Sequence, residues 1–521
     1  MSASDQAKPQ CPCLVVFAAQ GIQTYILRSD KLREIVGASE LVESMASELL
    51  DDTLRQIGIA DPNAIVLSRA AGTARILFPL EAQACRFALI WPLLVARHAP
   101  GLTVSVAMVP VKGHPLAAII AADDLLPLRR AYAAVDLPEA GPFTERHSRS
   151  GRPVADEWKG EDGPADHETG RKRDSSESGR YRLLGKILGP EASATEVWRL
   201  WPLEMEDIAD EHNGLAIFHA DGNGLGKSVI ALLHALQDKP ADEALEHYRD
   251  FCRGVEESTV EALKCALDEI MAETRQRRES TKNSQLKFPF RPLVCAGDDV
   301  TVILRDKDAM PFAETFLAAI QTKVRHRLSA QGLDQFTACG ALVYMRPKFP
   351  FADAYSLSES MCNETKRAVD RKHTALSFVR VASSLPGEYS DFIERERKLD
   401  ENHLLTMNPY LVGTAADGHP SLKDLRDLEK LTWKLPRGAL RETVASAYRS
   451  VAEADTGFNR FLQVLESSDK SRQHALKPDI LAAFRKLTGN PADSLWTAKS
   501  PHRTPLYDAL ELKAVSASPL P

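Results

Sequence analysis

The chain carries one order of strands and helices twice, and this repeat constrains its fold more than any other feature. In the first half, apolar periodicity predicts a strand from residue 13, helical structure to residue 50, strands at 64–69 and 74–78, a helix ending near 96, and a strand at 102–111. This strand–helix–strand–strand–helix–strand order is that of the split βαβ, or ferredoxin-like, unit.

The second half repeats this order after a polar segment. Its predicted elements are a strand at 215–220, helices at 228–236 and 241–279, strands at 292–296 and 300–304, a helix near 311–330, and a strand at 337–345. A helix at 352–369 and a strand at 374–380 follow. The turn between the two middle strands contains Ala71-Gly72 in the first copy and Ala296-Gly297 in the second, as expected of a diverged internal duplication.

A length of 521 residues exceeds one ordinary core, because domains average roughly 150 residues. We predict an α+β protein with two ferredoxin-like domains, at 11–136 and 201–386, and a helical C-terminal domain at 387–521. Residues 137–200 are rich in Gly, Pro, Ser and mixed charge and lack periodicity, so they are predicted to form a flexible polar linker or insertion.

Composition excludes several classes of protein. A net charge of −7 disfavours a protein that coats nucleic acid through bulk electrostatics, but it leaves a local RNA-binding groove open. The eight cysteines include no CxxC pair, which favours reduced thiols in a cytoplasmic protein over a disulfide framework or a four-cysteine zinc site. No signal-peptide pattern precedes Cys11, and the longest apolar run, 87–96, is too short to cross a bilayer and predicts a buried helix.

A carboxylate and a glycine-rich turn follow the first strand of the second copy. Asp221 opens the segment DGNGLGK (221–227), which leads directly from this strand into a helix. Glycines let a phosphate approach the backbone, and the free N–H groups of a helix N-terminus favour negative charge. The segment is therefore predicted to bind a nucleoside triphosphate, with Lys227 neutralising a phosphate oxygen.

Two adjacent acids, Asp298 and Asp299, lie at the tight turn between the middle strands of the second copy. In a ferredoxin-like unit this hairpin neighbours the first strand, so both carboxylates are expected near Asp221. Such carboxylates repel one another, but hard cations such as Mg²⁺ can bridge them and support nucleotidyl transfer. The first copy offers Phe17-Ala18-Ala19 and Thr73-Ala74 instead, so only the second copy is predicted to hold metal.

Each motif alone is weak evidence. An Asp-Asp pair in a turn is usually only solvated, and glycine-rich turns bind many phosphates or none. The main competing interpretation is a P-loop, whose motif ends like Gly226-Lys227-Ser228. Asp221, however, occupies the position of the first P-loop glycine, and the duplicated order of elements disagrees with a parallel P-loop sheet.

Two further residues have both a functional and a structural interpretation. Lys366 lies on a predicted helix that could flank the acidic hairpin, which makes it a candidate for binding phosphate, although such lysines are more often merely solvated. His219 alternates with apolar residues on the strand before Asp221, a pattern more typical of a structural histidine than of a general base.

Three segments carry a family resemblance: IQTYI with SDKLREIVGAS (22–26 and 29–39), DGNGLGK (221–227) and AGDD (296–299). With these segments the chain resembles the large palm-domain subunit of type III CRISPR effector complexes, the CRISPR polymerase or cyclase family. The resemblance spans most of the chain. It implies two palm domains, the second of them active, that make cyclic oligoadenylates from ATP with Mg²⁺ or Mn²⁺ in antiviral defence. It also implies other effector subunits, with guide and target RNA, as partners.

The resemblance also assigns roles to residues by position. Asp221, Asp298 and Asp299 would be the catalytic carboxylates and metal ligands, with the Gly222 carbonyl as a further ligand. Together with Lys366, which is a candidate from its predicted helix alone, the residues that would bind nucleotide are Ser39, Gly222, Asn223, Gly224, Gly226, Lys227 and Gly297. Among them, Ser39 of the first palm would lie near the second, acceptor nucleotide.

The sequence departs from the family pattern at several points. The N-terminal HD nuclease domain common in the family is absent from it, so DNA cleavage by this chain is not expected. Asn223 stands where the family often has a second Asp, and Ala296 replaces the first glycine of Gly-Gly-Asp-Asp. Residues 146–153 fill the region where the family often has zinc-binding cysteines.

Two alternatives keep the fold and change the function. The chain could be a catalytically silent scaffold of a crRNA-guided complex, although the three retained carboxylates argue against silence. It could also be a stand-alone palm cyclase that makes a cyclic dinucleotide without a guide RNA. The sequence leaves open the base preference, the ring size and linkage of the product, the activating signal and the oligomeric state.

Overall fold

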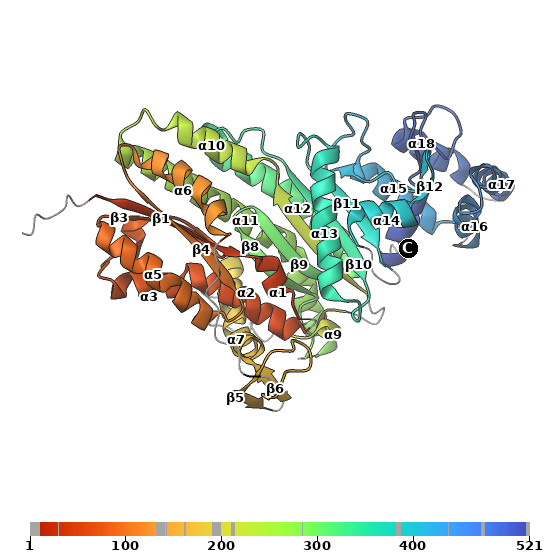
Figure 1. Ribbon diagram of the computed structural model, residues 1–521. Coiled ribbons are helices and arrows are strands. Elements are labelled where there is room, and N and C mark those ends of the chain that lie inside the picture. Colours follow the sequence, from red (N-terminus) through yellow and green to blue (C-terminus); the bar gives the residue numbers. More distant parts are fainter. Residues whose placement is uncertain are drawn as a thin grey trace, which may run out of the picture.

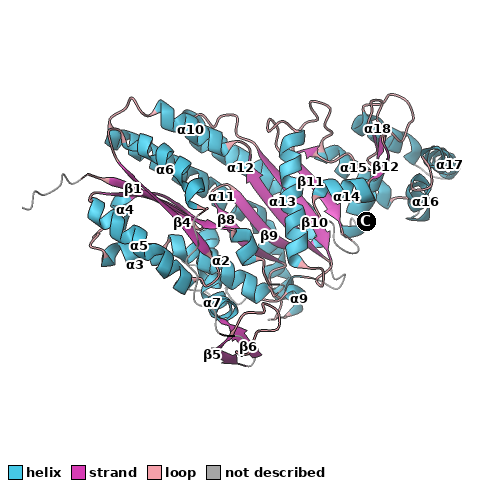
Figure 2. Cartoon of the chain, in the orientation of Figure 1, coloured by secondary structure: helices cyan, strands magenta, loops and turns pink. Residues whose placement is uncertain are grey.

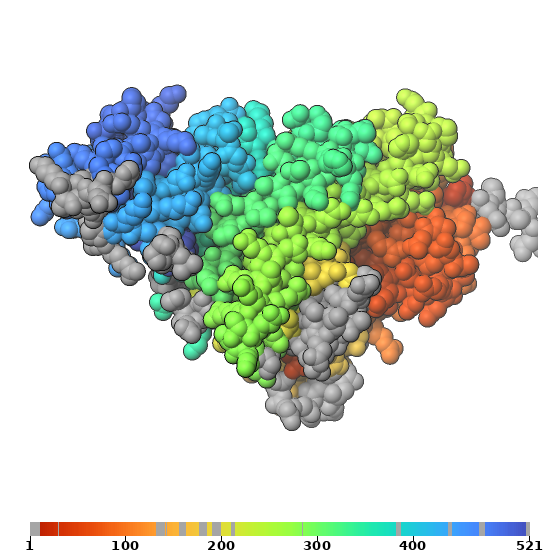
Figure 3. Space-filling model, turned by 180° about the vertical axis from the view of Figure 1, so that it is seen from behind, coloured from red at the N-terminus to blue at the C-terminus, as the bar shows by residue number. Residues whose placement is uncertain are grey.

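The computed structural model describes residues 11–516 except 30, 132–140, 142, 161–162, 190–199, 210–213, 284, 382–386, 436 and 470–474. The orange first domain, the green and cyan second domain and the blue C-terminal part lie in this order from left to right (Figure 1). From behind, too, the green second domain lies between the orange first domain and the blue C-terminal part (Figure 3). Helices flank the strands of the two main sheets (Figure 2).

The first domain is built on a four-stranded antiparallel sheet with the strand order β2-β3-β1-β4. Its strands are β1 (Cys13–Gln20), β2 (Val66–Ala70), β3 (Thr73–Phe78) and β4 (Thr103–Pro110). Its helices are α1 (Ile22–Ile26), α2 (Leu32–Ala46), α3 (Glu48–Gln56), α4 (Pro62–Ile65), α5 (Glu81–His98) and α6 (Pro115–Arg129). β1 pairs antiparallel with both β3 and β4, which is the predicted ferredoxin-like arrangement.

Two details of the first domain differ from the prediction. The strand expected at 64–69 begins at 66, because Asp61 caps the amide of Asn63 and starts the short helix α4. The helix expected to be buried over 87–96 is buried on one face only. Leu89 and Leu93 of α5 are 76% and 59% exposed, whereas Trp91 between them is fully buried. In a helix with 3.6 residues per turn, residues two positions apart, such as Leu89 and Trp91, lie on nearly opposite faces.

The second domain repeats the order in β10-β7-β9-β8, to which β11 and β14 add a further edge. Its strands are β7 (Leu215–Gly222), β8 (Phe290–Ala296), β9 (Asp299–Arg305), β10 (Ala338–Met345) and β11 (Ala375–Arg380). Its helices are α10 (Leu225–Ala235), α11 (Ala241–Thr281), α12 (Asp306–Leu328), the 3-10 turn η2 (Ser329–Gln331) and α13 (Phe351–Ala368). β7 is antiparallel to both of its neighbours, which rules out a parallel P-loop sheet.

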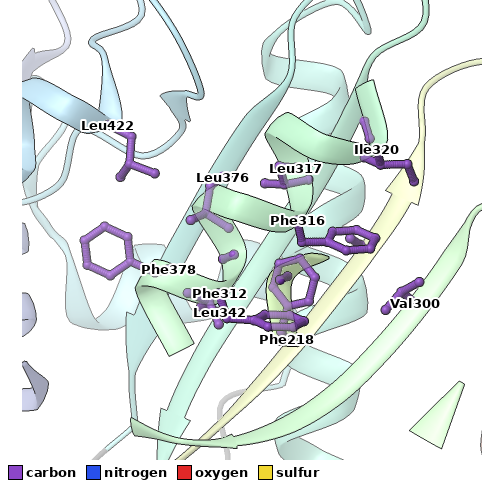
Figure 4. Packing of buried hydrophobic residues seen from close by; sticks show 14 of the residues in the cluster. Phe218, Val300, Phe312, Phe316, Leu317, Ile320, Leu342, Leu376, Phe378 and Leu422 are labelled. Carbon is purple, nitrogen blue, oxygen red and sulfur yellow. The ribbon is translucent and has the colours of Figure 1, made fainter. Parts of the chain in front are cut away.

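The core of the second domain lies on both faces of its sheet. Phe218 of β7 packs edge-on against Phe312 and Phe316 of α12, with ring centroids 5.3 and 5.5 Å apart (Figure 4). The neighbouring residue Ile217 belongs to the cluster on the opposite face, which includes Met361 of α13. This alternation fixes the register of β7 and therefore the place where Asp221 leaves the sheet.

Between the two domains, the described residues form helices and strands that the sequence did not predict. They include β5 (Val154–Gly160), β6 (Gly163–Asp166) and α7 (His167–Leu188), followed by the short helix α9 (Met205–Ile208). The predicted domain boundaries after residues 136 and 386 lie outside the described residues, and the boundary after residue 200 stays a prediction.

Buried charge pairs hold the first part of α7, where the sequence has no apolar periodicity. Glu34 of α2 is 2% exposed and accepts hydrogen bonds from Arg149 at 2.7 Å and from Arg173 of α7 at 3.0 Å. Burial alone would raise the pKa of Glu34, but the bonds from these arginines outweigh it and hold the pKa below its usual value. Beside it, Glu168 pairs with Lys172 at 2.6 Å.

The C-terminal part is mainly helical, as predicted, and adds short strands that were not predicted. Its helices are α14 (Tyr389–Glu396), α15 (Leu422–Trp433), α16 (Arg437–Ala447), α17 (Val451–Asp469), α18 (Leu476–Thr488) and α19 (Leu506–Val515). β12 (Lys398–Asp400), β13 (His403–Leu404) and β15 (His502–Arg503) form a small sheet, and β14 (Tyr410–Leu411) joins the sheet of the second domain.

Two further findings bear on the expectations from composition. Every one of the eight cysteines is a free thiol, in agreement with the absence of a disulfide framework. In the part of the chain that the structure describes, no helix combines the length and the apolar character needed to span a bilayer. The cytoplasmic location stays a prediction.

The contact between α2 and α7 yields a stability prediction. A Cβ atom at Gly37 of α2 would overlap the backbone carbonyl of Lys172, which cannot swing away as a side chain would. We expect Gly37→Ala to destabilise the protein by about 1–3 kcal/mol and to lower its melting temperature in a thermal shift assay.

Gly185→Ala is the matched control, because Gly185 lies inside α7 and its Cβ would meet no atom within 4 Å. Alanine is the better helix former, so this variant is expected to melt at the same temperature as the wild type or slightly above it. Equal melting of all three proteins would contradict the close approach of α2 and α7.

Candidate active site

Strand pairing brings the three predicted carboxylates to one end of the second domain's sheet. Asp221 lies at the end of β7, which pairs with β9 up to the pair Ala220 and Val300. Asp298 and Asp299 precede Val300 in the β8–β9 hairpin, so they come beside Asp221. Gly297, the first turn residue, has a φ of 61°, a conformation that favours glycine.

The carboxylate of Asp221 lies close enough to that of Asp298 to perturb its titration. Burial, followed by repulsion from Asp221, raises the pKa of Asp298 to about 7. Gly222 lies against the same group, because a Cβ atom at this position would overlap Oδ2 of Asp298. A larger residue after Asp221 would therefore displace the carboxylate of Asp298 from this position.

Asp299 begins β9 and lies beside His219 of β7. Burial, with repulsion from Asp221 and Glu359, raises the pKa of Asp299 to about 7. Its Oδ1 atom is buried and, within the described part of the chain, has no hydrogen-bond partner. The ring of His219 is 3.5 Å away, but burial lowers the pKa of His219 to about 4, so this neighbour is neutral at physiological pH.

His219 is bonded to the fold, as the structural interpretation predicted. Its Nδ1 atom lies 3.1 Å from the hydroxyl of Thr301 on β9, and its side chain is buried. The ring thus joins two neighbouring strands below the acidic hairpin. Because the ring is neutral, His219 offers the neighbouring carboxylates no positive charge.

Lys366 supplies positive charge from the other side. It lies on α13, is 3% exposed, and forms an ion pair with Oδ2 of Asp221. Its ammonium also donates to the Gly222 carbonyl at 3.0 Å. These two acceptors are also two of the predicted metal ligands. Lys366 is therefore not a solvated lysine, and its contact with nucleotide stays a prediction.

The glycine-rich turn leads from the carboxylates into α10. Gly224 has a φ of 75° and is the N-cap of this helix, whose first amides lie beyond it. Gly226 and Gly297 both line a cleft of about 370 Å³ between α10, α11 and the β2–β3 strands of the first domain. Lys227 is exposed at the start of α10.

Two of the predicted nucleotide-binding residues are engaged in contacts within the protein. The amide nitrogen of Asn223 donates to the Thr337 hydroxyl at 2.9 Å and to the His373 carbonyl at 3.2 Å, which braces the turn against β10. The hydroxyl of Ser39, on α2 of the first domain, donates to the backbone carbonyl of Leu293 in β8. The nucleotide contacts assigned to both residues stay predictions.

The donor set fits a hard divalent cation. Among the described residues, no three Asp, Glu, His or Cys side chains form a preformed metal-binding group. Nevertheless, Asp298 and Asp299 carry raised pKa values beside Asp221, and one buried oxygen of Asp299 has no partner. Carboxylate and carbonyl oxygens are the ligands that Mg²⁺ and Mn²⁺ prefer, and a cation would relieve this repulsion.

Two residues of the site were not predicted. Glu359 precedes Lys366 by seven residues on α13, which is about two helical turns. Helical periodicity could therefore have placed the two side chains on the same face. Lys186 of α7 bonds to β8 just before the hairpin, but it belongs to the segment predicted to be a flexible linker. Without a helix there, the sequence offered no signal for it.

Comparisons with known proteins reveal similarity in structure only. No protein-family model matches the chain, and no curated protein matches it either. The structure of a Csm1–Csm4 cassette in complex with AMPPNP covers 97% of this chain and 69% of that chain, with 13% identity and a TM-score of 0.50. At this identity the similarity establishes a shared fold and nothing beyond it.

Further solved structures are similar. Csm1 from T. onnurineus covers 97% of this chain and 70% of its own, with 14% identity and a TM-score of 0.49. A Csm1–Csm4 cassette in complex with cA3 covers 99% and 72%, with 14% identity and a TM-score of 0.47. The predicted α+β class and the family resemblance are thus confirmed at the level of the fold, which this chain shares with Csm1, the large subunit of type III CRISPR complexes.

Proposed function

We propose that this chain is a metal-dependent nucleotidyltransferase that converts ATP into a cyclic oligoadenylate or a related second messenger. The observation that carries the proposal is the meeting of Asp221, Asp298 and Asp299 at one end of the second sheet. Carboxylates that repel one another at a strand end and a hairpin are suited to hold cations. Solved cassettes that contain Csm1 carry AMPPNP and cA3, which agrees with adenine nucleotides as substrate and product.

Each residue of the site has a distinct role in this proposal. The three carboxylates and the Gly222 carbonyl would hold Mg²⁺ or Mn²⁺, and Lys366 orients Asp221 and that carbonyl. Bound divalent cations would activate the attacking 3′ hydroxyl and stabilise the leaving pyrophosphate. The first amides of α10 and the exposed Lys227 bind the phosphates.

The cleft between the two domains offers space for nucleotide beside these residues. Gly226 and Gly297 connect it to the glycine-rich turn and to the acidic hairpin, respectively. By analogy with the Csm1–Csm4 cassettes, we propose that the chain works with other effector subunits, guide RNA and target RNA in antiviral defence. A catalytically silent scaffold and a stand-alone cyclase are outcomes that the following experiment separates.

The activity is tested with purified full-length protein, labelled ATP and Mg²⁺ or Mn²⁺, with products identified by mass spectrometry. We expect pyrophosphate release and an oligoadenylate product from the wild type. Asp298→Ala with Asp299→Ala removes two cation ligands, so the rate should fall at least about 10³-fold, because metal-ion stabilisation contributes several kcal/mol to such reactions.

Asp268→Asn with Glu269→Gln is the matched control for this pair. These adjacent acids are exposed on α11 of the same domain, and the double variant should retain wild-type activity. A product from ATP alone that is a cyclic dinucleotide would favour the stand-alone cyclase. No product from any nucleoside triphosphate, even with candidate effector subunits and RNA, would favour the silent scaffold.

The raised pKa values predict how stability depends on pH. Both Asp298 and Asp299 titrate near 7 in the fold, against an ordinary value of 3.8, so the folded state binds protons more tightly. Their favourable contribution is complete below about pH 4 and is lost as the pH rises through 7. Asp298→Asn should therefore melt at least about 2 °C above the wild type at pH 8, with a smaller difference near pH 4.

Divalent cations should stabilise the wild type more than Asp298→Asn. Because Mg²⁺ or Mn²⁺ would bind the folded state, either ion should raise the melting temperature of the wild type at pH 8 and have little effect on Asp298→Asn. Asp268→Asn, at an exposed site, should respond as the wild type does. Equal responses in all three proteins would argue against cation binding at the hairpin.

A further inference from the structure

One side chain from the segment between the domains reaches the strand that carries the acidic hairpin. Lys186 lies near the C-terminal end of α7 and is largely buried. Its ammonium donates to the backbone carbonyl of Cys295 at 2.8 Å. Cys295 is in β8, directly before Ala296 and the turn, so this bond anchors the base of the hairpin.

The same ammonium joins both domains. It lies 3.2 Å from the carboxylate of Glu43 on α2 of the first domain and 2.8 Å from that of Glu256 on α11 of the second. The two glutamates and the carbonyl take up the three hydrogen-bonding directions of an ammonium group. Lys186 therefore links α2 of the first domain to α11 and β8 of the second domain.

The position of β8 in the sheet explains why such a link matters. β8 is the edge strand of the order β10-β7-β9-β8, so β9 supports it on one side only. The outward carbonyls of an edge strand lack partners in the sheet. Ser39 of the first domain bonds to Leu293 and Lys186 bonds to Cys295, so alternate carbonyls along this edge are held from outside the domain.

We propose that Lys186 is a positioning residue that fixes the hairpin bearing Asp298 and Asp299 relative to Asp221. Lys186 and Ser39 donate hydrogen bonds to carbonyls on the outer edge of β8, where none of the described strands pairs with them. The effect of Lys186 on catalysis rests on the proposed function. Its effect on the position and mobility of the hairpin does not.

The consequence for kinetics is specific. The residues proposed to bind phosphates lie on the turn between β7 and α10, and Lys186 does not contact them. Loss of Lys186 should therefore leave the KM for ATP within about 2-fold and lower kcat by about 10–100-fold, because a displacement near 1 Å costs about that much. A general loss of packing would not lower kcat while leaving the KM for ATP unchanged.

The test compares full-length wild type with Lys186→Met and Lys186→Arg. Met keeps the apolar stem and removes the ammonium, whereas Arg keeps the charge and the donors. Hydrogen exchange read by mass spectrometry follows residues 290–299, and steady-state kinetics with ATP give kcat and KM. We expect faster exchange over this segment and lower kcat in Lys186→Met, with both largely restored in Lys186→Arg.

Arg171→Met is the matched control on the same helix. Arg171 also donates to a backbone carbonyl, that of His98 at 3.5 Å, but it does not reach β8. This variant should loosen the docking of α7 without changing exchange at 290–299 or kcat. If Lys186→Met does not fold, Lys186→Gln, which keeps a donor, replaces it.

Two results would overturn the proposal. One is unchanged exchange over residues 290–299 in the Lys186 variant, and the other is faster exchange there with unchanged kcat. If the wild type makes no product at all, the proposed function fails by itself. The exchange measurement then still decides whether Lys186 holds the hairpin.

Discussion

The antiparallel pairing of β7 with β9 is the interaction on which the candidate site depends. It places the end of one strand beside the turn of the next hairpin, so Asp221 meets Asp298 and Asp299 although the long helix α11 separates them in the chain. The register is fixed from both faces, since Phe218 and Ile217 belong to different cores. A slip by one residue would turn Asp221 to the other face of the sheet.

The same meeting of charges makes the site electrostatically costly. Two carboxyl groups are held near a third in surroundings that raise their pKa values, and the nearest histidine is neutral. Lys366 offsets part of this repulsion from α13 by pairing with Asp221. Such stored repulsion is common where a protein is built to receive a charged ligand. The repulsion lowers the stability of the folded state, and the packing of the surrounding core offsets this loss.

Much of the fold and the carboxylates could be predicted from the sequence, because strand and helix periodicities are local signals. Asp221 and the acidic pair follow apolar strands whose order alone predicts that they are neighbours. The beginning of α7 could not be predicted in this way, because buried ion pairs such as Glu34 with Arg173 hold it. Lys186 was missed because its segment was predicted to be a linker. The bracing role of Asn223 depends on Thr337 and His373, which only the tertiary fold brings near.

The protected edge of β8 has a consequence for how this protein can assemble. An open edge strand invites a strand of another chain to pair with it. Here the outer edge of β8 faces bonds from Ser39 and Lys186, and the opposite edge of the same sheet ends in β14, which spans only two residues. The edge at β8 therefore offers little template for strand addition. Assembly by strand addition at β8 would first have to break these two bonds, so the edge next to the acidic hairpin is protected from it.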